Sequence, residues 1–280
     1  MPTSSYTPVP PFLYGTAWKE ERTASLTKLA LQTGFRGIDT ANQRKHYFEA
    51  AVGEGLAAAC DAGMVTRAGI FLQTKFTYRD GQDQRLPYDP TAPLSVQVAQ
   101  SMASSLEHLR TGYVDSYVLH GPASAHEWTD ADSEVWQAMA EQRDAGRTRL
   151  LGVSNISLRQ LEQMAAVHKE APAFVQNRCF AQRRWDRDIR RFCRERGIVY
   201  QGFSLLTANR GVLLHPPVVA LAARRSATPA QLVFRFAAAL GILPLTGTSD
   251  AAHMAQDLAS PRGSLSAEEV AFLESVAYIE

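Results

Sequence analysis

Residues 149–169 read RLLGVSNISLRQLEQMAAVHK and contain the structural unit that decides the fold. The apolar run at 149–154 predicts a β-strand, and apolar residues spaced three and four apart predict a helix over 158–169. Ser157 and Gln160 stand at capping-box spacing, which marks the start of that helix. The stretch therefore predicts a strand, a turn and a helix in succession.

The same succession recurs along the whole chain. We expect strands at residues 12–16, 35–39, 70–75, 114–120, 149–154, 174–177, 198–203 and 242–245. We expect helices near residues 21–33, 48–61, 95–110, 133–144, 158–169, 186–196 and 229–239. Two further helical segments follow the last strand, the second over 267–278, where Ser266 and Glu269 repeat the capping-box spacing.

Strands that alternate with helices predict parallel βαβ units. Eight such units in 280 residues predict an α/β fold, a closed (β/α)8 TIM barrel with two extra C-terminal helical segments. A doubly wound open sheet is the alternative, but a dinucleotide-binding sheet of that kind would normally carry GxGxxG after its first strand, and this motif is absent. Without a linker or low-complexity tract, residues 1–280 are expected to form a single domain.

The overall charge is close to neutral, because 29 Lys and Arg residues against 28 Asp and Glu residues give a net charge of +1. This balance gives no reason to expect a nucleic-acid or membrane partner. The N-terminus has neither the basic start nor the apolar stretch of a signal peptide. Cys60, Cys179 and Cys193 form no CxxC pair, which is typical of reduced thiols, so we expect a soluble cytoplasmic protein.

Seven arginines crowd around the helix expected at 186–196. Trp185, Ile189, Phe192 and Cys193 fall at helical spacing and predict a buried stripe. The arginines are then expected on the opposite, solvated face, and phosphate or partner binding is the alternative.

In a barrel of this kind the functional site lies at the C-terminal ends of the strands. A single polar residue there is usually a cap or a surface residue, but several that converge on one end of a barrel favour chemistry. The polar residues at or just beyond the expected strand ends are Asp39, Lys75, His120, Ser154, Asn155, Gln176, Asn177 and Ser204, with Tyr47 shortly after the first of them.

These residue types suggest a division of labour. A buried lysine beside an aspartate stays charged and lowers the pKa of a neighbouring phenol from about 10. Such a phenol can give a proton to a carbonyl oxygen, which a histidine can hold by a hydrogen bond. No nucleophile has an adjacent base, which argues against acyl transfer. No histidine lies in an HxH or HExxH pattern, so we expect no metal site.

Several short stretches follow one another in a specific order over nearly the whole chain. They are 15–19 (GTAWK), 34–41 (GFRGIDTA), 52–53 (VG), 74–75 (TK), 113–115 (YVD), 120–122 (HGP), 152–155 (GVSN), 175–177 (VQN), 197–204 (GIVYQGFS) and 247–249 (GTS). In these stretches the sequence resembles the aldo-keto reductase family. The resemblance implies a (β/α)8 barrel that reduces aldehydes or ketones with a nicotinamide cofactor extended across the end of the barrel.

The resemblance implies that Asp39, Lys75 and His120 are three of the four catalytic residues. The usual spacing would put the fourth, a tyrosine, at the position of Arg44, but the loop here is two residues longer. Tyr47 is the only tyrosine in that loop, and we expect it to be the proton donor. An alternative arrangement would pack Tyr47 under the loop, with Arg44 or His46 facing the substrate.

The resemblance also implies a site for NADP(H), with NAD(H) as a second cofactor. Ser154, Asn155, Gln176 and Asn177 would contact the carboxamide, and Phe203 would stack on the nicotinamide ring. The rest of the cofactor would contact Thr16, Ser204, Leu206, Gly247, Thr248, His253, Gln256 and Asp257.

Family members that prefer NADPH usually hold its 2′-phosphate with a lysine and an arginine at the positions of Gly247 and His253. A weaker preference over NADH is therefore expected. Trp18, Tyr78, Trp128 and loop 76–93 are expected to wall an open substrate pocket, because Gly121 follows His120 and the chain ends soon after the last helix. An open pocket predicts broad and weak substrate acceptance.

The sequence thus predicts an NAD(P)H-dependent oxidoreductase that reduces aldehyde or ketone carbonyls to alcohols. A small carbonyl compound would be its partner, and a monomer is the expected state. One alternative is a non-catalytic nicotinamide-binding barrel that acts as a sensor or partner subunit. Another is a different barrel enzyme, such as a phosphosugar isomerase, which would not bind nicotinamide.

Overall fold

Eight parallel strands form a closed barrel in the computed structural model, which describes residues 8–276. In chain order the strands are β1 (Leu13–Gly15), β2 (Gly37–Asp39), β3 (Phe71–Phe76), β4 (Val114–Leu119), β5 (Thr148–Ser154), β6 (Phe174–Arg178), β7 (Val199–Phe203) and β8 (Leu243–Thr246). Each strand pairs with the next, and β8 pairs with β1 to close the barrel. The (β/α)8 fold expected from the sequence is confirmed.

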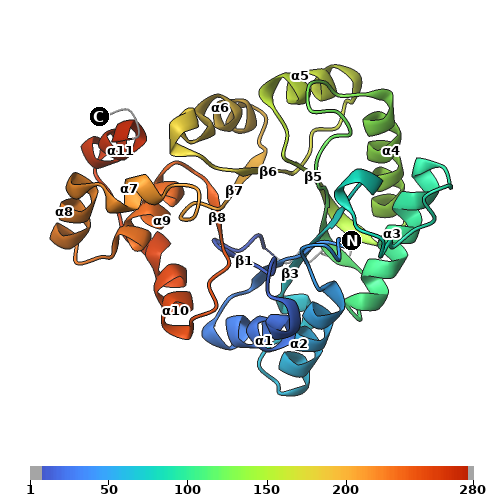
Figure 1. Ribbon diagram of the computed structural model, residues 1–280, viewed down its shortest axis with the longest axis horizontal. Helices are drawn as coiled ribbons and strands as arrows, with labels where there is room; N and C mark the ends of the chain where they lie inside the picture. Colours follow the sequence, from blue (N-terminus) through green and yellow to red (C-terminus); the bar gives the residue numbers. More distant parts are fainter. Residues whose placement is uncertain (1–7, 277–280) are drawn as a thin grey trace, which may run out of the picture.

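Helices surround the strands, and all but the last of them follow the colour order of the chain around the barrel (Figure 1). They are α1 (Thr23–Thr33), α2 (Glu49–Asp61), α3 (Leu94–His108), α4 (Asp130–Asp144), α5 (Leu158–Val167), α6 (Arg187–Glu195), α7 (Arg210–Leu214), α8 (Pro216–Arg224), α9 (Pro229–Ala239), α10 (Ala251–Ala259) and α11 (Ala267–Ser275). None of those described is both long and apolar enough to cross a membrane.

Helices α10 and α11 are the two segments expected after the last strand, although residues 277 and 278 of the expected range lie outside the described residues. Helices α7 and α8 are not among the helices expected from the sequence. The Pro216–Pro217 pair resembles a break, yet proline is tolerated in the first turn of a helix, which is where α8 places it. Leu221 and Ala222 then supply a buried face.

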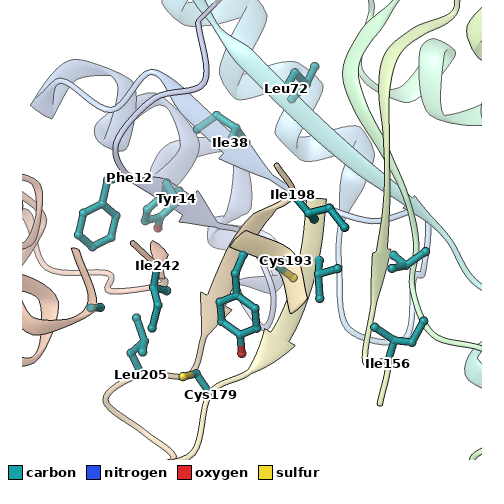
Figure 2. Close-up of a cluster of buried hydrophobic side chains, with 14 of the residues drawn as sticks. Phe12, Tyr14, Ile38, Leu72, Ile156, Cys179, Cys193, Ile198, Leu205 and Ile242 are labelled. Carbon is teal, nitrogen blue, oxygen red and sulfur yellow. The ribbon is translucent and has the colours of Figure 1, made fainter. Parts of the chain in front are cut away.

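Side chains alternate between the inside of the barrel and its outer face along each strand. Outward residues such as Ile38 on β2 and Leu72 on β3 belong to a large apolar cluster between the strands and the helices (Figure 2). A smaller, separate cluster consists of Leu13, Phe71, Phe174, Leu243 and Leu245. We call this smaller cluster the barrel plug, because most of its members start their strands and point inward.

The arginine-rich segment differs from expectation at two residues, Ile189 and Arg190, and Ile189 of the expected buried stripe is only partly buried. Trp185, Phe192 and Cys193 are buried as the helical spacing predicts. Arg190, expected on the solvated face, is only 7% exposed. Its Nε donates to the carbonyl oxygen of Trp185 at 2.7 Å, and its Nη2 lies 2.8 Å from Glu274 Oε1. This arginine therefore ties α6 to α11 instead of facing solvent.

Candidate active site

Lys75 and Asp39 form an ion pair inside the barrel. They lie on the neighbouring strands β3 and β2, and they are 1% and 3% exposed. Lys75 Nζ donates to Asp39 Oδ1 at 2.7 Å, to Asp39 Oδ2 at 2.8 Å and to the carbonyl oxygen of Thr40 at 2.8 Å. These bonds use the three N–H donors of the ammonium group. Burial lowers the pKa of Lys75, and the charge of Asp39 opposes that shift.

Tyr47 lies beside this pair and beside His120. Its ring centroid is 5.3 Å from Lys75 Nζ and 5.9 Å from the His120 ring, which it meets edge-on. Burial raises the pKa of Tyr47, and the negative charge of Asp39 raises it further. The sequence predicts a phenol pKa lowered by Lys75. In the structure the pKa of Tyr47 shifts in the opposite direction, because burial of the phenol and then the negative charge of Asp39 both raise it.

The longer loop after β2 brings Tyr47 inward through a tight turn. The backbone N–H groups of His46 and Tyr47 both donate to the carbonyl oxygen of Gln43, at 3.1 and 2.9 Å. Arg44 points elsewhere, with Nη1 3.3 Å from Glu20 Oε2 and its guanidinium 4.2 Å from the centre of the Phe48 ring. The arrangement in which Arg44 faces the substrate therefore does not occur here.

His120 follows β4 and is held by Thr77. The Thr77 hydroxyl oxygen lies 2.7 Å from His120 Nδ1. Burial, with the nearby charges of Lys75 and His46, lowers the pKa of His120 to about 3, so the ring is neutral near pH 7. When the hydroxyl donates to Nδ1, the ring proton resides on Nε2, which makes Nε2 a hydrogen-bond donor.

A cavity of about 1500 Å³ opens above these residues. Asp39, Tyr47 and His120 line it, and so do Trp18 and Tyr78, two of the three residues expected to wall the substrate pocket. His46 also lines it, with its ring 4.1 Å from that of Trp18. Among residues 8–276, no group of three or more His, Cys, Asp or Glu residues is arranged to hold a metal ion.

Trp128, the third residue expected in the pocket wall, does not line the cavity. Its indole Nε1 donates to Ser133 Oγ at 3.0 Å, and its ring meets His168 edge-on at 6.0 Å. Because these contacts hold the ring against α4, Trp128 is a packing residue in this structure.

A second group of residues lines the cavity at the ends of β5 to β8. It consists of Ser154, Asn155, Gln176, Asn177, Phe203, Ser204, Leu206, Gly247 and Thr248. Asn155 and Ser204 adopt left-handed backbone conformations, with φ of 51° and 55°. Backbone strain of this kind is often found at functional sites. The Asn155 amide also donates to the His120 carbonyl oxygen at 2.7 Å, which joins this group to the first.

Comparison with known proteins agrees with this geometry. A model of the Aldo/keto reductase family matches residues 13–277. The chain belongs to the aldo-keto reductase family. Members of this family are oxidoreductases that act on carbonyl compounds with NAD(P)H.

Two curated relatives and one solved structure illustrate the match. The chain is 30% identical over 248 residues to an aldo-keto reductase of Mycolicibacterium vanbaalenii, covering 88% of this chain and 80% of that protein. It is 27% identical over 268 residues to prostaglandin F synthase 1 of Bos taurus, covering 85% of this chain and 78% of that protein. An aldo-keto reductase of Bombyx mori, solved in complex with NADP, has a TM-score of 0.80 at 24% identity and covers 95% of this chain and 89% of its own.

Four residues expected to contact the cofactor of this aldo-keto reductase lie outside the cavity lining: Thr16, His253, Gln256 and Asp257. Thr16 is buried and donates its hydroxyl to the carbonyl oxygen of Asp39 at 3.0 Å. Asp257 accepts from Thr246 Oγ1 at 2.7 Å, and burial raises the pKa of Asp257 to about 6. His253 and Gln256 are exposed on α10.

Asn177 lines the cavity, but its amide is engaged by backbone. Its Oδ1 accepts from the N–H of Ile156 at 3.0 Å, and its Nδ2 donates to the carbonyl oxygen of Ile156 at 2.8 Å. This pair of bonds clamps the loop that follows β5. The expected contact between Asn177 and the carboxamide would therefore compete with a structural role.

Among the residues at or beneath this aldo-keto reductase's cavity, the sequence does not single out Lys19, Gln73, Thr77 and Gln201. Thr77 does belong to loop 76–93, which is expected in the pocket wall. Gln73 and Gln201 occupy inward positions two residues before Lys75 and Phe203, so the strand alternation could have indicated them. Lys19 lines the cavity and donates to the carbonyl oxygen of Gly247. No sequence signal marks Thr77 as the partner of His120, because that contact depends on where His120 lies.

Proposed function

We propose that this aldo-keto reductase reduces aldehydes or ketones to alcohols with a reduced nicotinamide nucleotide, within a single barrel domain, and that Tyr47 donates the proton. One observation carries the proposal. The buried Lys75–Asp39 pair, the Tyr47 phenol and the neutral His120 ring converge beneath one large cavity. A packing role alone gives no reason for a neutral histidine and a phenol to line a cavity above a buried charge pair.

The residues at the ends of β5 to β8 fit a nicotinamide nucleotide. Phe203 offers a partly exposed aromatic ring to the cavity, and Gln176 and Ser154 offer polar groups beside it. An aromatic face beside a few fixed polar groups is suited to a flat, amide-bearing ring. When bound, the reduced nicotinamide would supply the hydride for the carbonyl carbon.

The protein's own residues would then handle the carbonyl oxygen. His120 Nε2–H would hold that oxygen, and Tyr47 would give it a proton. The raised pKa of Tyr47 keeps the phenol protonated and ready to donate. As negative charge develops on the phenol oxygen, Lys75, fixed by Asp39, would stabilise it by its positive field.

We further propose that the protein prefers NADP(H) over NAD(H), but by a smaller factor than it would if an arginine bound the 2′-phosphate of NADP(H). Gly247 has no side chain, and His253 is an exposed residue of α10 that does not line the cavity. Neither replaces the bidentate contact of an arginine with a phosphate. The ratio of kcat/KM for NADPH to that for NADH should stay below about a thousandfold. A larger ratio would mean that another cation of the protein holds the 2′-phosphate.

The proposal extends to the compartment and the assembly state. Cys60, Cys179 and Cys193 are all free thiols, which supports a reducing environment such as the cytoplasm. We propose a cytoplasmic monomer whose partner is a small carbonyl compound. Size-exclusion chromatography with light scattering would test the monomer.

Mixing the purified protein with NADPH tests the proposed function directly. We expect a change in nucleotide fluorescence on binding, followed by loss of the reduced nucleotide when an aromatic aldehyde is added. A parallel sample without aldehyde is the control for slow oxidation. Binding without consumption of any of a panel of aldehydes and ketones would indicate a sensor or partner subunit. No binding of NADPH or NADH would contradict the proposal.

A further inference from the structure

A layer of buried amides crosses the barrel between the barrel plug and the catalytic candidates. Asp39 and Gln73 are neighbours on β2 and β3, and Gln176 and Gln201 are neighbours on β6 and β7. All four side chains are at most 3% exposed. The two pairs come from opposite sides of the barrel, and hydrogen bonds join them inside it.

Two glutamines share the same pair of acceptors. Gln73 Nε2 donates to Asp39 Oδ1 at 2.7 Å and to Gln201 Oε1 at 2.9 Å. Gln176 Nε2 donates to the same two oxygens, at 3.0 and 2.8 Å. Gln201 Nε2 donates back to Gln73 Oε1 at 3.0 Å. Both N–H groups of the Gln176 amide are therefore used inside the barrel.

Asp39 determines which end of each amide in this layer, the nitrogen or the oxygen, faces inward. A carboxylate paired with Lys75 accepts hydrogen bonds and has no proton to donate, so the amides beside it must present their nitrogen atoms. Gln201 must then present its oxygen to both of those nitrogens. The Gln176 amide is thereby fixed with its nitrogen inward, and Oε1 is the polar atom left for the cavity that Gln176 lines.

Stability alone does not account for the layer. Barrel interiors usually pack bulky branched apolar side chains in layers, as the barrel plug does here. Replacing both partners of a buried hydrogen bond by apolar groups of similar shape is often close to neutral. A satisfied buried network does, however, hold its members in one orientation.

We propose that Gln201 is a positioning residue that, together with Asp39, fixes the Gln176 amide as an acceptor, and that Gln73 holds Gln201 in place. The cavity then selects a ligand with an N–H donor there. Given the proposed function, on which this inference rests, that donor is the primary carboxamide of the nicotinamide. The chain thus sets the identity and orientation of the ring through two residues that do not touch it.

Binding of two nucleotides tests the inference without any turnover. The first is NADPH, and the second is its 3-acetylpyridine analogue, in which a methyl group replaces the carboxamide NH2. The wild type should bind NADPH about tenfold more tightly than the analogue, as expected for one hydrogen bond into a fixed acceptor. In Gln201→Met the ratio of the two Kd values should fall to about threefold, because the Gln176 amide loses one of the two bonds that hold its nitrogen inward and keeps only the bond to Asp39 Oδ1.

Gln142→Met is the matched control. Gln142 is a buried glutamine of α4 that accepts from Arg147 Nη1 at 2.8 Å, away from the cavity. The Gln142→Met variant should keep the wild-type ratio of the two Kd values even if it is less stable than the wild type. Gln73→Met should lower the ratio less than Gln201→Met does, because Gln73 holds Gln201 and makes no hydrogen bond to Gln176 itself. The inference remains testable if one of the two variants fails to fold.

Three results would overturn the inference. An unchanged ratio in the folded Gln201→Met and Gln73→Met proteins would show that they do not fix Gln176. Equal Kd values for the two nucleotides in the wild type would show that Gln176 accepts no carboxamide N–H, while leaving the proposed function standing. If neither nucleotide binds at all, the proposed function fails and the inference fails with it.

Discussion

The hydroxyl of Thr77 is hydrogen-bonded to His120, and the direction of that bond sets which ring nitrogen can hold a substrate oxygen. It lies 2.7 Å from Nδ1, and the ring is neutral because burial lowers the pKa of His120 to about 3. A neutral imidazole has one donor and one acceptor nitrogen, so a hydroxyl that donates to Nδ1 places the proton on Nε2. We therefore propose that Thr77 is a positioning residue that acts through His120.

Replacing Thr77 by valine keeps the shape of the side chain but removes its hydroxyl. We expect kcat/KM for carbonyl reduction to fall about tenfold, because the loss of one hydrogen bond typically costs a factor of this size. The Kd for NADPH should change little. Thr77→Ser restores the hydroxyl and should recover most of the activity. Equal losses in the valine and serine variants would show that Thr77 serves packing and not the orientation of His120.

The sequence could locate the strand-end residues but not all of their contacts. Asp39, Lys75 and His120 follow apolar runs that predict strands, and parallel strands in a barrel bring their ends together. The direction of Trp128 depends on a loop and on its contact with Ser133, which no spacing encodes. The pKa of Tyr47 depends on burial and on Asp39, and neither is visible in the sequence.

At the scale of the elements, helices α2 and α3 meet at a glycine. A Cβ atom on Gly53 would lie 1.9 Å from the carbonyl oxygen of His108, the last residue of α3. That oxygen is backbone, so it cannot move aside as the end of a side chain could. The absence of a Cβ at Gly53 thus sets how closely α2 approaches the end of α3.

We predict that Gly53→Ala lowers the free energy of unfolding by about 1–3 kcal/mol or more, although alanine is the better helix former. Gly211→Ala is the matched control, since Gly211 is also helical and a Cβ atom added to it would meet nothing within 4 Å. It should be neutral or stabilising by up to about 1 kcal/mol. Urea unfolding of both variants checks this, and equal stability of the two would contradict the close contact.

A histidine links the same two helices in a pH-dependent way. His108 Nδ1 lies 3.2 Å from Glu49 Oε2, and the hydrogen bond to Glu49 raises the pKa of His108 above its usual 6.5. A pKa raised on folding means that the charged histidine stabilises the folded state. The contribution is fully present below the unfolded-state pKa and is lost as the pH rises through the folded-state pKa.

His108→Gln keeps a hydrogen-bonding group but removes the charge. We expect the wild type to be more stable than this variant at about pH 6, with the difference shrinking by about pH 9. Urea midpoints measured across that range would show the trend. A difference that stays constant with pH would mean that the pair is not charged in the folded protein.

Element boundaries show what local sequence can and cannot predict. All eight strands are expected from the sequence because each is an apolar run bounded by turn residues. Helix α8 is not, because the Pro216–Pro217 pair suggests a break while the buried face of Val218 and Leu221 depends on packing against α9. The burial of Arg190 likewise depends on packing, because Arg190 contacts Glu274 of α11, which lies far from it along the chain.

Across the whole molecule, the barrel interior is stacked in three levels. Most of the barrel plug occupies the N-terminal ends of the strands, and the amide layer of Gln73, Gln176 and Gln201 lies above it. The catalytic candidates lie at the C-terminal ends. The hydrogen bonds of the middle level join residues as many as 137 positions apart. Periodicity places such residues inside the barrel, but it does not predict which of them meet. That residues 1–280 form a single domain stays a prediction.

The central claim is that Tyr47 donates the proton to a carbonyl oxygen in the cavity, and Tyr47→Phe tests it most directly. The Kd for NADPH and the kcat for an aldehyde should be measured together for the wild type, Tyr47→Phe and Tyr113→Phe. Tyr113, stacked between Arg67 and Arg149 before β4, is the control for the same chemical change. We predict that Tyr47→Phe binds NADPH about as well as the wild type but loses about 10²- to 10⁴-fold in kcat, while Tyr113→Phe does not. Turnover by Tyr47→Phe close to that of the wild type would contradict the claim and point to His46, which also lines the cavity.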